Sequence, residues 1–244
     1  MNELHRLDQL LVAKKLVNSR QRAEVLIREG GVTVDGKVID KPGKKFDLEA
    51  MISLIREPMP WVSRAALKIL AAIDHWKLET SIHSKTCMDV GASTGGFTQV
   101  LLEKGATKVF ALDTGHGQLV QIIAEDDRVV NLEKHNIRNT PLEEIGKVDF
   151  IVVDVSFISL TLVLPELLKF RNTNTPVLAL VKPQFEVGPA ALGRNGIVQK
   201  ESDRLKALET VKKTALTLGY TIQGTIDSPI SGGDGNREFL IYLT

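Results

Sequence analysis

The chain has 244 residues, 43% of them hydrophobic and 25% charged, and a formal net charge of +1. This composition is ordinary for a soluble globular protein, and the length allows one large domain or a medium domain with a small one. The single cysteine, Cys87, excludes an intrachain disulfide and gives no sign of a four-ligand zinc site, so we expect no bound metal.

The first 56 residues predict a small module of two helices followed by a hairpin. Leucines at helical spacing predict a first helix around residues 7–11. Asn18 and Ser19 offer an N-cap for a second helix, which we expect Gly30-Gly31 to end. Residues 32–39 form two short apolar runs around Asp35-Gly36, a dipeptide typical of tight hairpin turns.

This module is the more basic part of the chain. Residues 1–56 carry eleven basic and eight acidic side chains, a balance of +3, which leaves −2 for the remainder. A small basic module attached to a nearly neutral larger one suits a reader of polyanions coupled to an enzyme. An ordinary solvated surface explains the charge balance equally well.

Residues 57–62 form the expected linker, because Pro58 and Pro60 stiffen this stretch and disfavour helix just before each proline. Ser63 is expected to cap a helix whose apolar face continues to Trp76. The larger domain is then expected to span residues 63–244.

From residue 85 onward, strands and helices alternate, which predicts an α/β fold with a mostly parallel sheet and helices on both faces. Strands are expected at 86–90, 108–112, 128–131, 148–153 and 176–181, and helices at 96–103, 118–124, 159–169 and 200–218. The last two strands, 221–226 and 238–243, have no helix between them, so we expect an antiparallel pair at the edge of the sheet.

No segment is expected to enter a membrane. The most apolar long stretch, residues 150–168, carries Asp154, and a charge is costly inside a bilayer. The first residues lack the apolar core of a signal peptide. We therefore expect a cytoplasmic protein.

A glycine-rich loop follows the first strand of the larger domain. Its spacing, G-x-x-x-G-G over residues 91–96, is neither the G-x-G-x-x-G of dinucleotide folds nor a phosphate-binding P-loop, so NAD and ATP are disfavoured. Glycines let the backbone approach a ligand closely. Asp113, at the end of the next strand, is placed to accept hydrogen bonds from a ribose diol. A tight turn without a ligand is the alternative.

Two further charges end apolar strands. Asp154 follows 148–153 and Lys182 follows 176–181, and ligands of open α/β sheets bind outside the carboxyl ends of the strands. A salt bridge between neighbouring strand ends would explain both residues without a ligand. Lys68 alone would be read as a solvated helix lysine, and Glu238 alone as an edge-strand charge.

Taken together, these motifs resemble known families. Residues 89–96 with Asp113 resemble the S-adenosylmethionine (SAM) site of class I methyltransferases, which have a Rossmann-like fold. The order of Lys68, Asp154, Lys182 and Glu238 resembles the Lys-Asp-Lys-Glu tetrad of FtsJ-like ribose 2′-O-methyltransferases. The first module resembles an S4 RNA-binding domain. This layout is that of the TlyA family, described as ribosomal RNA (rRNA) cytidine 2′-O-methyltransferases and often labelled hemolysins.

The resemblance implies the site residues and the partners. The tetrad would be catalytic, and the partner would be rRNA or a ribosomal subunit. SAM would be bound by Asp89, Gly91, Ala92, Ser93, Thr94, Gly95, Gly96, Phe97, Asp113, Asn136 and Asp154, with Asn136 contacting adenine. RNA would be bound by Arg6, Lys14, Lys15, Arg20, Arg22, Arg28 and Arg64.

The tetrad suits the chemistry of a ribose 2′-hydroxyl, which is a poor nucleophile at neutral pH. Lys182 would act either as a general base or as a cation that stabilises developing alkoxide. Asp154 and Glu238 would orient Lys182. Lys68 would offset their negative charge and hold the ribose or a phosphate of the RNA. We further expect residues 182–196 to form a mobile loop over the site.

Two alternatives stay open on the sequence alone. The chain could be an RNA-binding protein with a vestigial methyltransferase fold, although such a protein has no chemical need for an intact tetrad. A membrane-lytic protein, as the hemolysin label suggests, is disfavoured because no apolar span or strongly amphipathic basic helix is evident.

Overall fold

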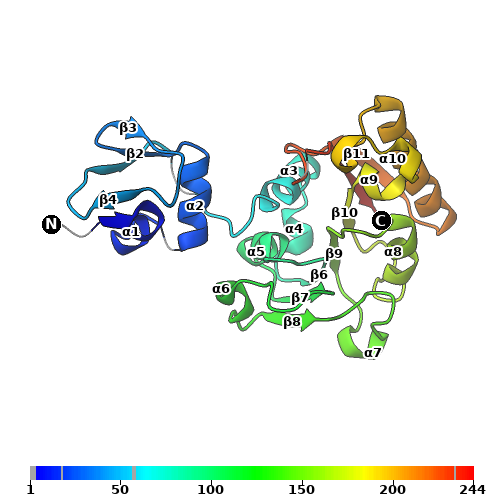
Figure 1. Ribbon diagram of the computed structural model, residues 1–244. Coiled ribbons are helices and arrows are strands. Elements are labelled where there is room, and N and C mark those ends of the chain that lie inside the picture. Colours follow the sequence, from blue (N-terminus) through cyan, green and yellow to red (C-terminus); the bar gives the residue numbers. More distant parts are fainter. Residues whose placement is uncertain (1–3, 18, 57–58, 234) are drawn as a thin grey trace. The chain divides into compact units, whose positions relative to one another are not determined.

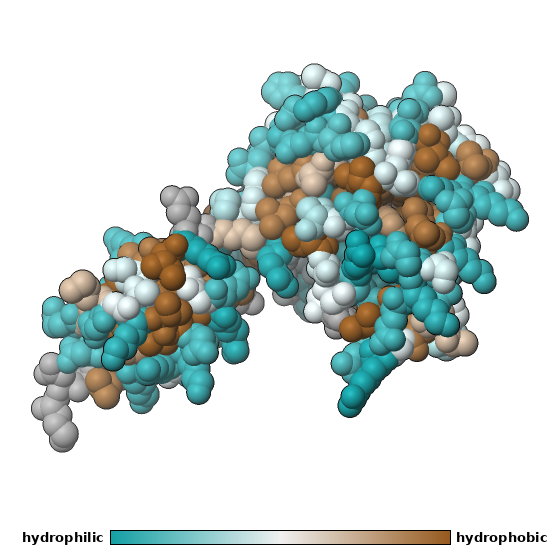
Figure 2. Space-filling model, turned by 90° about the horizontal axis from the view of Figure 1, so that it is seen from above, coloured by the Kyte–Doolittle hydropathy of each residue, from teal (hydrophilic) through white to brown (hydrophobic). Residues whose placement is uncertain are grey.

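The computed structural model describes residues 4–17, 19–56, 59–233 and 235–244. The chain divides into two compact units, residues 1–60 and 61–244 (Figure 1). Two residues of the expected linker, Glu57 and Pro58, lie outside the described residues. Hydrophilic side chains cover much of the visible surface of each unit, with apolar patches between them, as in ordinary globular domains (Figure 2).

The first unit contains the two expected helices and the expected hairpin, together with three strands that the sequence analysis did not predict. Its elements are β1 (Leu4–Arg6), α1 (Leu7–Ala13), α2 (Arg20–Arg28), β2 (Val32–Val34), β3 (Lys37–Val38), β4 (Lys45–Asp47) and β5 (Ile52–Leu54). β1 pairs with β4, and β2 pairs with both β3 and β5, all antiparallel. Ser19 caps α2 by accepting a hydrogen bond from the Arg22 N–H, whereas Asn18 lies outside the described residues.

The second unit is built on a seven-stranded sheet in the order β11-β12-β10-β9-β6-β7-β8. Its strands are β6 (Thr86–Val90), β7 (Lys108–Asp113), β8 (Val129–Glu133), β9 (Phe150–Val153), β10 (Val177–Val181), β11 (Ile222–Asp227) and β12 (Phe239–Leu243). The strands from β10 to β8 are parallel, and β12 runs antiparallel to both β10 and β11. The predicted α/β class and antiparallel edge are confirmed.

Helices pack on both faces of this sheet (Figure 1). They are α3 (Ala66–Trp76), α4 (Glu79–Ile82), α5 (Gly96–Glu103), α6 (Gln121–Ala124), α7 (Leu142–Ile145), α8 (Leu160–Leu167), α9 (Pro183–Glu186) and α10 (Glu201–Thr217). Successive side chains of β9 point to opposite faces. Phe150 and Val152 pack with α3 and α5, whereas Ile151 and Val153 pack with α8 and α10.

The start of α3 differs from the prediction that Ser63 caps it. The Ser63 hydroxyl accepts a hydrogen bond from the Ala65 N–H at 3.1 Å, and the helix begins at Ala66 with Ala65 as its N-cap. Residues 63–65 form a tighter turn, in which the Ala66 N–H bonds to the Ser63 carbonyl oxygen. The serine therefore shapes the turn that leads into the helix, and the helix starts two residues later than expected.

The apolar stretch at residues 150–168 folds as β9 followed by α8, as expected. Among the described residues, no helix is long and apolar enough to cross a membrane.

Candidate active site

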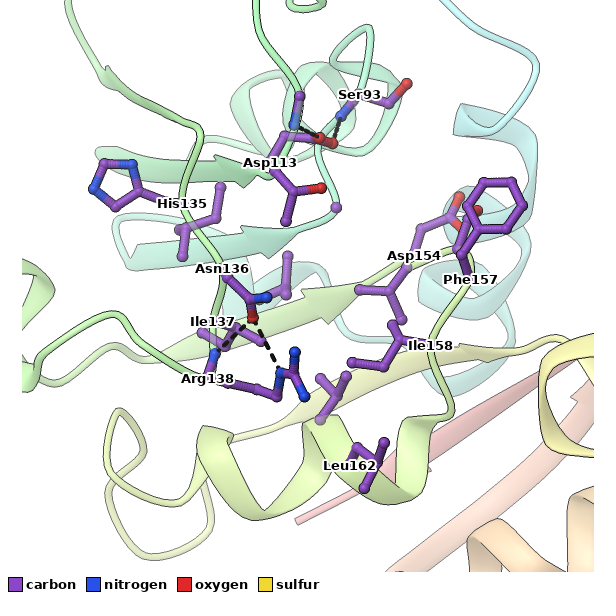
Figure 3. Close-up of a pocket in the computed structure, with 18 of the residues that line it drawn as sticks. Ser93, Asp113, His135, Asn136, Ile137, Arg138, Asp154, Phe157, Ile158 and Leu162 are labelled. Atoms are coloured by element: carbon purple, nitrogen blue, oxygen red, sulfur yellow. Dashed lines mark hydrogen bonds between the residues drawn. The ribbon is translucent and has the colours of Figure 1, made fainter.

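A cavity of about 940 Å³ opens at the carboxyl ends of the parallel strands (Figure 3). The glycine loop, the end of β7 and the segments that follow β8 and β9 line it. A smaller hollow of about 160 Å³ shares Gly91, Ser93, Asp154 and Ser156 with the cavity and adds Lys182. The two spaces therefore meet at the end of β9.

The glycine loop lies against the chain that leaves β9. Gly91 has a φ of +91°, and a Cβ at this position would lie 2.3 Å from the Asp154 carbonyl oxygen. A side chain is therefore excluded there on both conformational and steric grounds. The N–H groups of Gly91 and Ala92 both donate to the Leu112 carbonyl oxygen, which fixes the loop above β7.

Asp113 holds the next turn of this loop. Its Oδ2 accepts from the Ser93 N–H and its Oδ1 from the Gly115 N–H, each at 2.8 Å (Figure 3). A carboxylate can accept about four hydrogen bonds, so Asp113 retains acceptor capacity toward the cavity. Asn136 faces the same space, and its Oδ1 accepts from the Arg138 N–H at 3.1 Å.

The remaining residues of the expected SAM site divide into two groups. Ala92, Thr94, Gly96 and Phe97 line the smaller hollow. Asp89 and Gly95 line neither space.

Asp89 is fully buried beneath the loop. Its Oδ2 accepts from the Thr98 hydroxyl at 2.7 Å, and its Oδ1 has no partner in the described part of the chain. Burial raises the pKa of the Asp89 carboxyl to about 7. Asp89 therefore lies beneath the glycine loop and does not line the cavity or the smaller hollow.

The four residues of the expected tetrad form two ion pairs. Lys182 Nζ lies 2.6 Å from Asp154 Oδ1 and donates to the Ser156 hydroxyl at 2.9 Å. Lys68 Nζ donates to Glu238 Oε2 at 2.6 Å. The second pair is the deeper one, with 9% of the Lys68 side chain and 2% of the Glu238 side chain exposed.

The two pairs are electrostatically linked. Burial raises the pKa of the Glu238 carboxyl, the positive charges of Lys68 and Lys182 counteract this rise, and the negative charge of Asp154 adds to it. Glu238 was expected to orient Lys182, but its ion-pair partner is Lys68. The reason lies in the topology, because β12 runs antiparallel beside β10 and so brings the start of β12 to the site.

Two residues of this region were given no role from the sequence. Ser156 accepts a hydrogen bond from Lys182. Phe157 is 92% exposed, has a φ of +64°, and lies 5.2 Å from the Phe185 ring between centroids. A bulky residue at positive φ is rare and marks a strained backbone, often at a functional site. Both belong to the Asp-Val-Ser-Phe motif at residues 154–157, which resembles the family's pattern and was the signal in the sequence.

The segment expected to be a mobile loop is attached at both ends. Glu186 in α9 accepts from the Ser159 hydroxyl and the Leu160 N–H, at 2.5 and 2.8 Å. At the far end, Asn236 accepts from the Val198 N–H and donates to the Gly196 carbonyl oxygen. These hydrogen bonds fix both ends of the segment. Its closure over a ligand stays a prediction.

The residues expected to bind RNA differ in their surroundings. Lys14, Lys15 and Arg28 are exposed in the first unit, and Arg64 is exposed in the second. Arg22 donates to the Pro60 carbonyl oxygen at 3.0 Å. Arg6 and Arg20 both bind the carboxylate of Asp8, which the sequence analysis did not predict.

Comparisons with known proteins agree with this architecture. The family model for FtsJ-like methyltransferases matches residues 61–244, and the family model for the S4 domain matches residues 5–52. The chain belongs to the FtsJ-like methyltransferase family. The four residues that resemble the Lys-Asp-Lys-Glu tetrad of this family are the ones that form the two ion pairs.

Several relatives span nearly the whole chain. The 16S/23S rRNA (cytidine-2′-O)-methyltransferase TlyA of Mycobacterium tuberculosis is 40% identical, over 98% of this chain and 89% of its own length. Hemolysin A of Brachyspira hyodysenteriae is 36% identical, over 98% and 99% respectively. A solved structure of a proposed hemolysin from Streptococcus thermophilus has 41% identity and a TM-score of 0.77, and it covers 100% of this chain and 89% of that one. The predicted TlyA-type layout is therefore confirmed.

Proposed function

We propose that this FtsJ-like methyltransferase uses SAM to methylate the 2′-hydroxyl of a cytidine ribose in rRNA. The observation that carries the proposal is the pair of ion pairs, Lys182–Asp154 and Lys68–Glu238, beside a cavity at the carboxyl ends of the sheet. The name of the M. tuberculosis relative supports the choice of base and of rRNA.

The cavity fits the chemistry of SAM. Asp113 provides carboxylate oxygens for a ribose diol, and Asn136 provides an amide that can contact adenine. Ile137 and Leu162 supply apolar walls in the same cavity. The glycine loop leaves its backbone bare at Gly91, where the large cavity meets the hollow that contains Lys182. SAM bound here would supply an electrophilic methyl group on a sulfonium.

Lys182 would act on the acceptor hydroxyl. It is held by Asp154 and Ser156, which fix the position of Nζ. A fixed ammonium stabilises an alkoxide as it develops, and such preorganised charge needs no rearrangement during the reaction. We therefore assign Lys182 an electrostatic role. The 2′-oxygen would bond to the methyl carbon as the bond from that carbon to the sulfonium sulfur breaks, S-adenosylhomocysteine would leave, and the hydroxyl proton would pass to solvent water.

Lys68 and Glu238 would stabilise the position of Lys182 from the buried side of the site. Their buried pair places a fixed carboxylate close enough for Glu238 to interact with Lys182 and Asp154. Removing either partner leaves an unpaired charge in a buried position. The pair would therefore hold the geometry at Lys182 more than it would touch the substrate.

The aromatic pair Phe157 and Phe185 suits a nucleotide acceptor. Both rings line the cavity, and Phe157 is almost wholly exposed. Unpaired bases of RNA are commonly stacked on aromatic side chains, and an enzyme that reaches a single nucleotide draws it out of its stack. The first unit, which matches the S4 domain, would contact the RNA backbone through its basic residues.

The test is methyl transfer from labelled SAM to purified ribosomal subunits and to free rRNA. We expect label in ribose 2′-oxygens with the wild-type protein, and a loss of about 10²–10⁴-fold for Lys182→Ala. Lys206→Ala, an exposed lysine on α10, is the matched control and should retain full activity. SAM affinity, measured by calorimetry, should be equal in all three proteins.

Other outcomes would redirect the assignment. SAM binding without transfer to any RNA would favour an RNA-binding protein with a vestigial site. Label in bases instead of riboses would remove the role given to Lys182. Leakage of liposomes by the purified protein would favour the membrane-lytic alternative.

A further inference from the structure

The first unit contains a buried carboxylate that binds two arginines. Asp8 has no exposed side-chain surface. Its Oδ1 accepts from Arg6 Nε and from the Gln9 N–H, both at 3.0 Å. Its Oδ2 accepts from Arg6 Nη2 at 2.8 Å and from Arg20 Nε at 2.9 Å. All four hydrogen bonds of this carboxylate are therefore made within the unit.

The backbone fixes this cluster from both sides. The Asp8 N–H donates to the Pro42 carbonyl oxygen, which ties the start of α1 to the chain that leads into β4. A Cβ at Gly43 would lie 3.1 Å from Arg6 Nη1, so the guanidinium of Arg6 lies close against the glycine backbone. The side chain of Arg6 is thus confined between Asp8 and Gly43.

The hydrogen bonds to Asp8 leave part of each guanidinium available. Arg6 uses Nε and Nη2, and Arg20 uses Nε, so Arg6 Nη1 and both terminal nitrogens of Arg20 are not needed for Asp8. The two side chains remain 38% and 54% exposed. Because both bind the same oxygen, two guanidinium groups are held side by side, and together with Asp8 they carry a formal charge of +1. Glu24 lies at the edge of this cluster, with its Oε1 3.6 Å from Arg20 Nε.

Such an arrangement matches a phosphate of the RNA backbone. Arginine binds phosphate through two parallel N–H groups, and this geometry gains strength when the fork is fixed in advance. Two free arginine side chains would lose rotamer entropy on binding. We propose that Asp8 is a positioning residue that prepares Arg6 and Arg20 as a two-arginine site for one RNA phosphodiester. This inference rests on the proposed rRNA-binding function of the unit.

If Asp8 positions the two arginines, removing its negative charge should change RNA affinity in the opposite direction to that expected from net charge alone. Removing a carboxylate from a basic RNA-binding surface normally strengthens binding, because RNA is a polyanion. Loss of Asp8 should instead weaken binding, because Arg6 and Arg20 lose their common anchor. Glu29, an exposed acid after α2, is the matched control, because Glu29→Gln makes the same charge change in the same unit.

The experiment measures binding of the full chain to deproteinised rRNA as a function of salt. We expect Asp8→Asn to weaken binding about tenfold, which corresponds to one lost charge-assisted contact. The slope of log affinity against log salt should become shallower by about 0.7–0.9 for a lost phosphate contact. Glu29→Gln should bind as tightly as wild type or more tightly.

A double-mutant cycle separates positioning from folding. Asp8→Asn should have no further effect on RNA affinity in a chain that already carries Arg6→Ala and Arg20→Ala. Hydrogen exchange of α1 and α2 should be equally slow in Asp8→Asn and wild type. If the exchange of these helices becomes fast, Asp8 is merely structural and the inference is wrong.

The remaining outcomes distinguish the two proposals. Equal affinity and salt slope for Asp8→Asn and wild type, with wild type binding rRNA, would overturn the role of Asp8 alone. Absence of rRNA binding by the wild-type chain would overturn the proposed function itself.

Discussion

Replacing Lys68 by methionine should destabilise the second unit in a pH-dependent way. The change leaves Glu238, which is 2% exposed, without its ion-pair partner. The buried carboxyl would then take up a proton, and this limits the loss. Protonating a carboxyl of ordinary pKa 4.5 at pH 7.5 costs about 4 kcal/mol, and at pH 5.5 about 1.4 kcal/mol. The upper limit agrees with the 3–5 kcal/mol typical of a broken buried pair.

The sign of this pH dependence follows from the direction of the shift. In the variant, the folded state keeps the Glu238 proton, while the unfolded state releases it above its ordinary pKa of 4.5. The stability of Lys68→Met should therefore be highest below pH 4.5 and fall as the pH rises. Its deficit relative to wild type should shrink by up to about 1.4 kcal/mol for each unit that the pH is lowered from 7.5.

Urea unfolding followed by tryptophan fluorescence is the assay, because both tryptophans, Trp61 and Trp76, lie in the second unit. The double variant Lys68→Met with Glu238→Gln should lose clearly less stability than the sum of the single variants. Methyl transfer should be lost in all three. A Lys68→Met protein that unfolds like wild type at pH 7.5, or a deficit that does not change with pH, would refute the reasoning.

Three further predictions concern single side chains of the second unit. Asp113→Ala removes the acceptor for the Ser93 and Gly115 N–H groups and should weaken SAM binding at least about tenfold by calorimetry; unchanged affinity would contradict its assigned place. Asp89, whose pKa burial raises to about 7, keeps its proton in the folded state while the unfolded state releases it, so wild type should lose up to about 4 kcal/mol between pH 4 and 7. Asp89→Asn should lack this loss. If the free energy of unfolding changes equally with pH in the two proteins between pH 4 and 7, the assigned effect of Asp89 is excluded. Cys87 is buried and its pKa is raised to about 12, so the native protein should not react with a thiol reagent that labels the urea-unfolded chain within minutes.

The sequence was sufficient for those features that depend on local pattern and on the rules of parallel sheets. Asp154 and Lys182 end β9 and β10, which are neighbours, so their pairing follows once both strands are recognised. The glycine spacing at 91–96 was also interpretable from the sequence, because Gly91 and Gly95 have φ values above zero, which glycine adopts readily. The class of fold was predictable for the same reason.

Other contacts depend on tertiary structure that a local pattern does not contain. Lys68 and Glu238 are separated by 170 positions and meet because β12 lies between β10 and β11. Asp8 resembles an ordinary acid in the first turn of a helix, and its burial depends on Arg6, Arg20 and the chain before β4. The strands β1, β4 and β5 have three residues each, which is too short for an alternating pattern to show.

Because β12 is the last strand of the chain, the cavity lining is synthesised before the ion-pair partner of Lys68. Every residue that lines the large cavity lies between positions 90 and 185, whereas the partner of Lys68 arrives only at position 238. A chain cut short after α9 would carry the residues that line the cavity and lack the buried carboxylate of Glu238. A chain that terminates before residue 238 would thus leave Lys68 without its ion-pair partner, and we expect it to lack transfer activity.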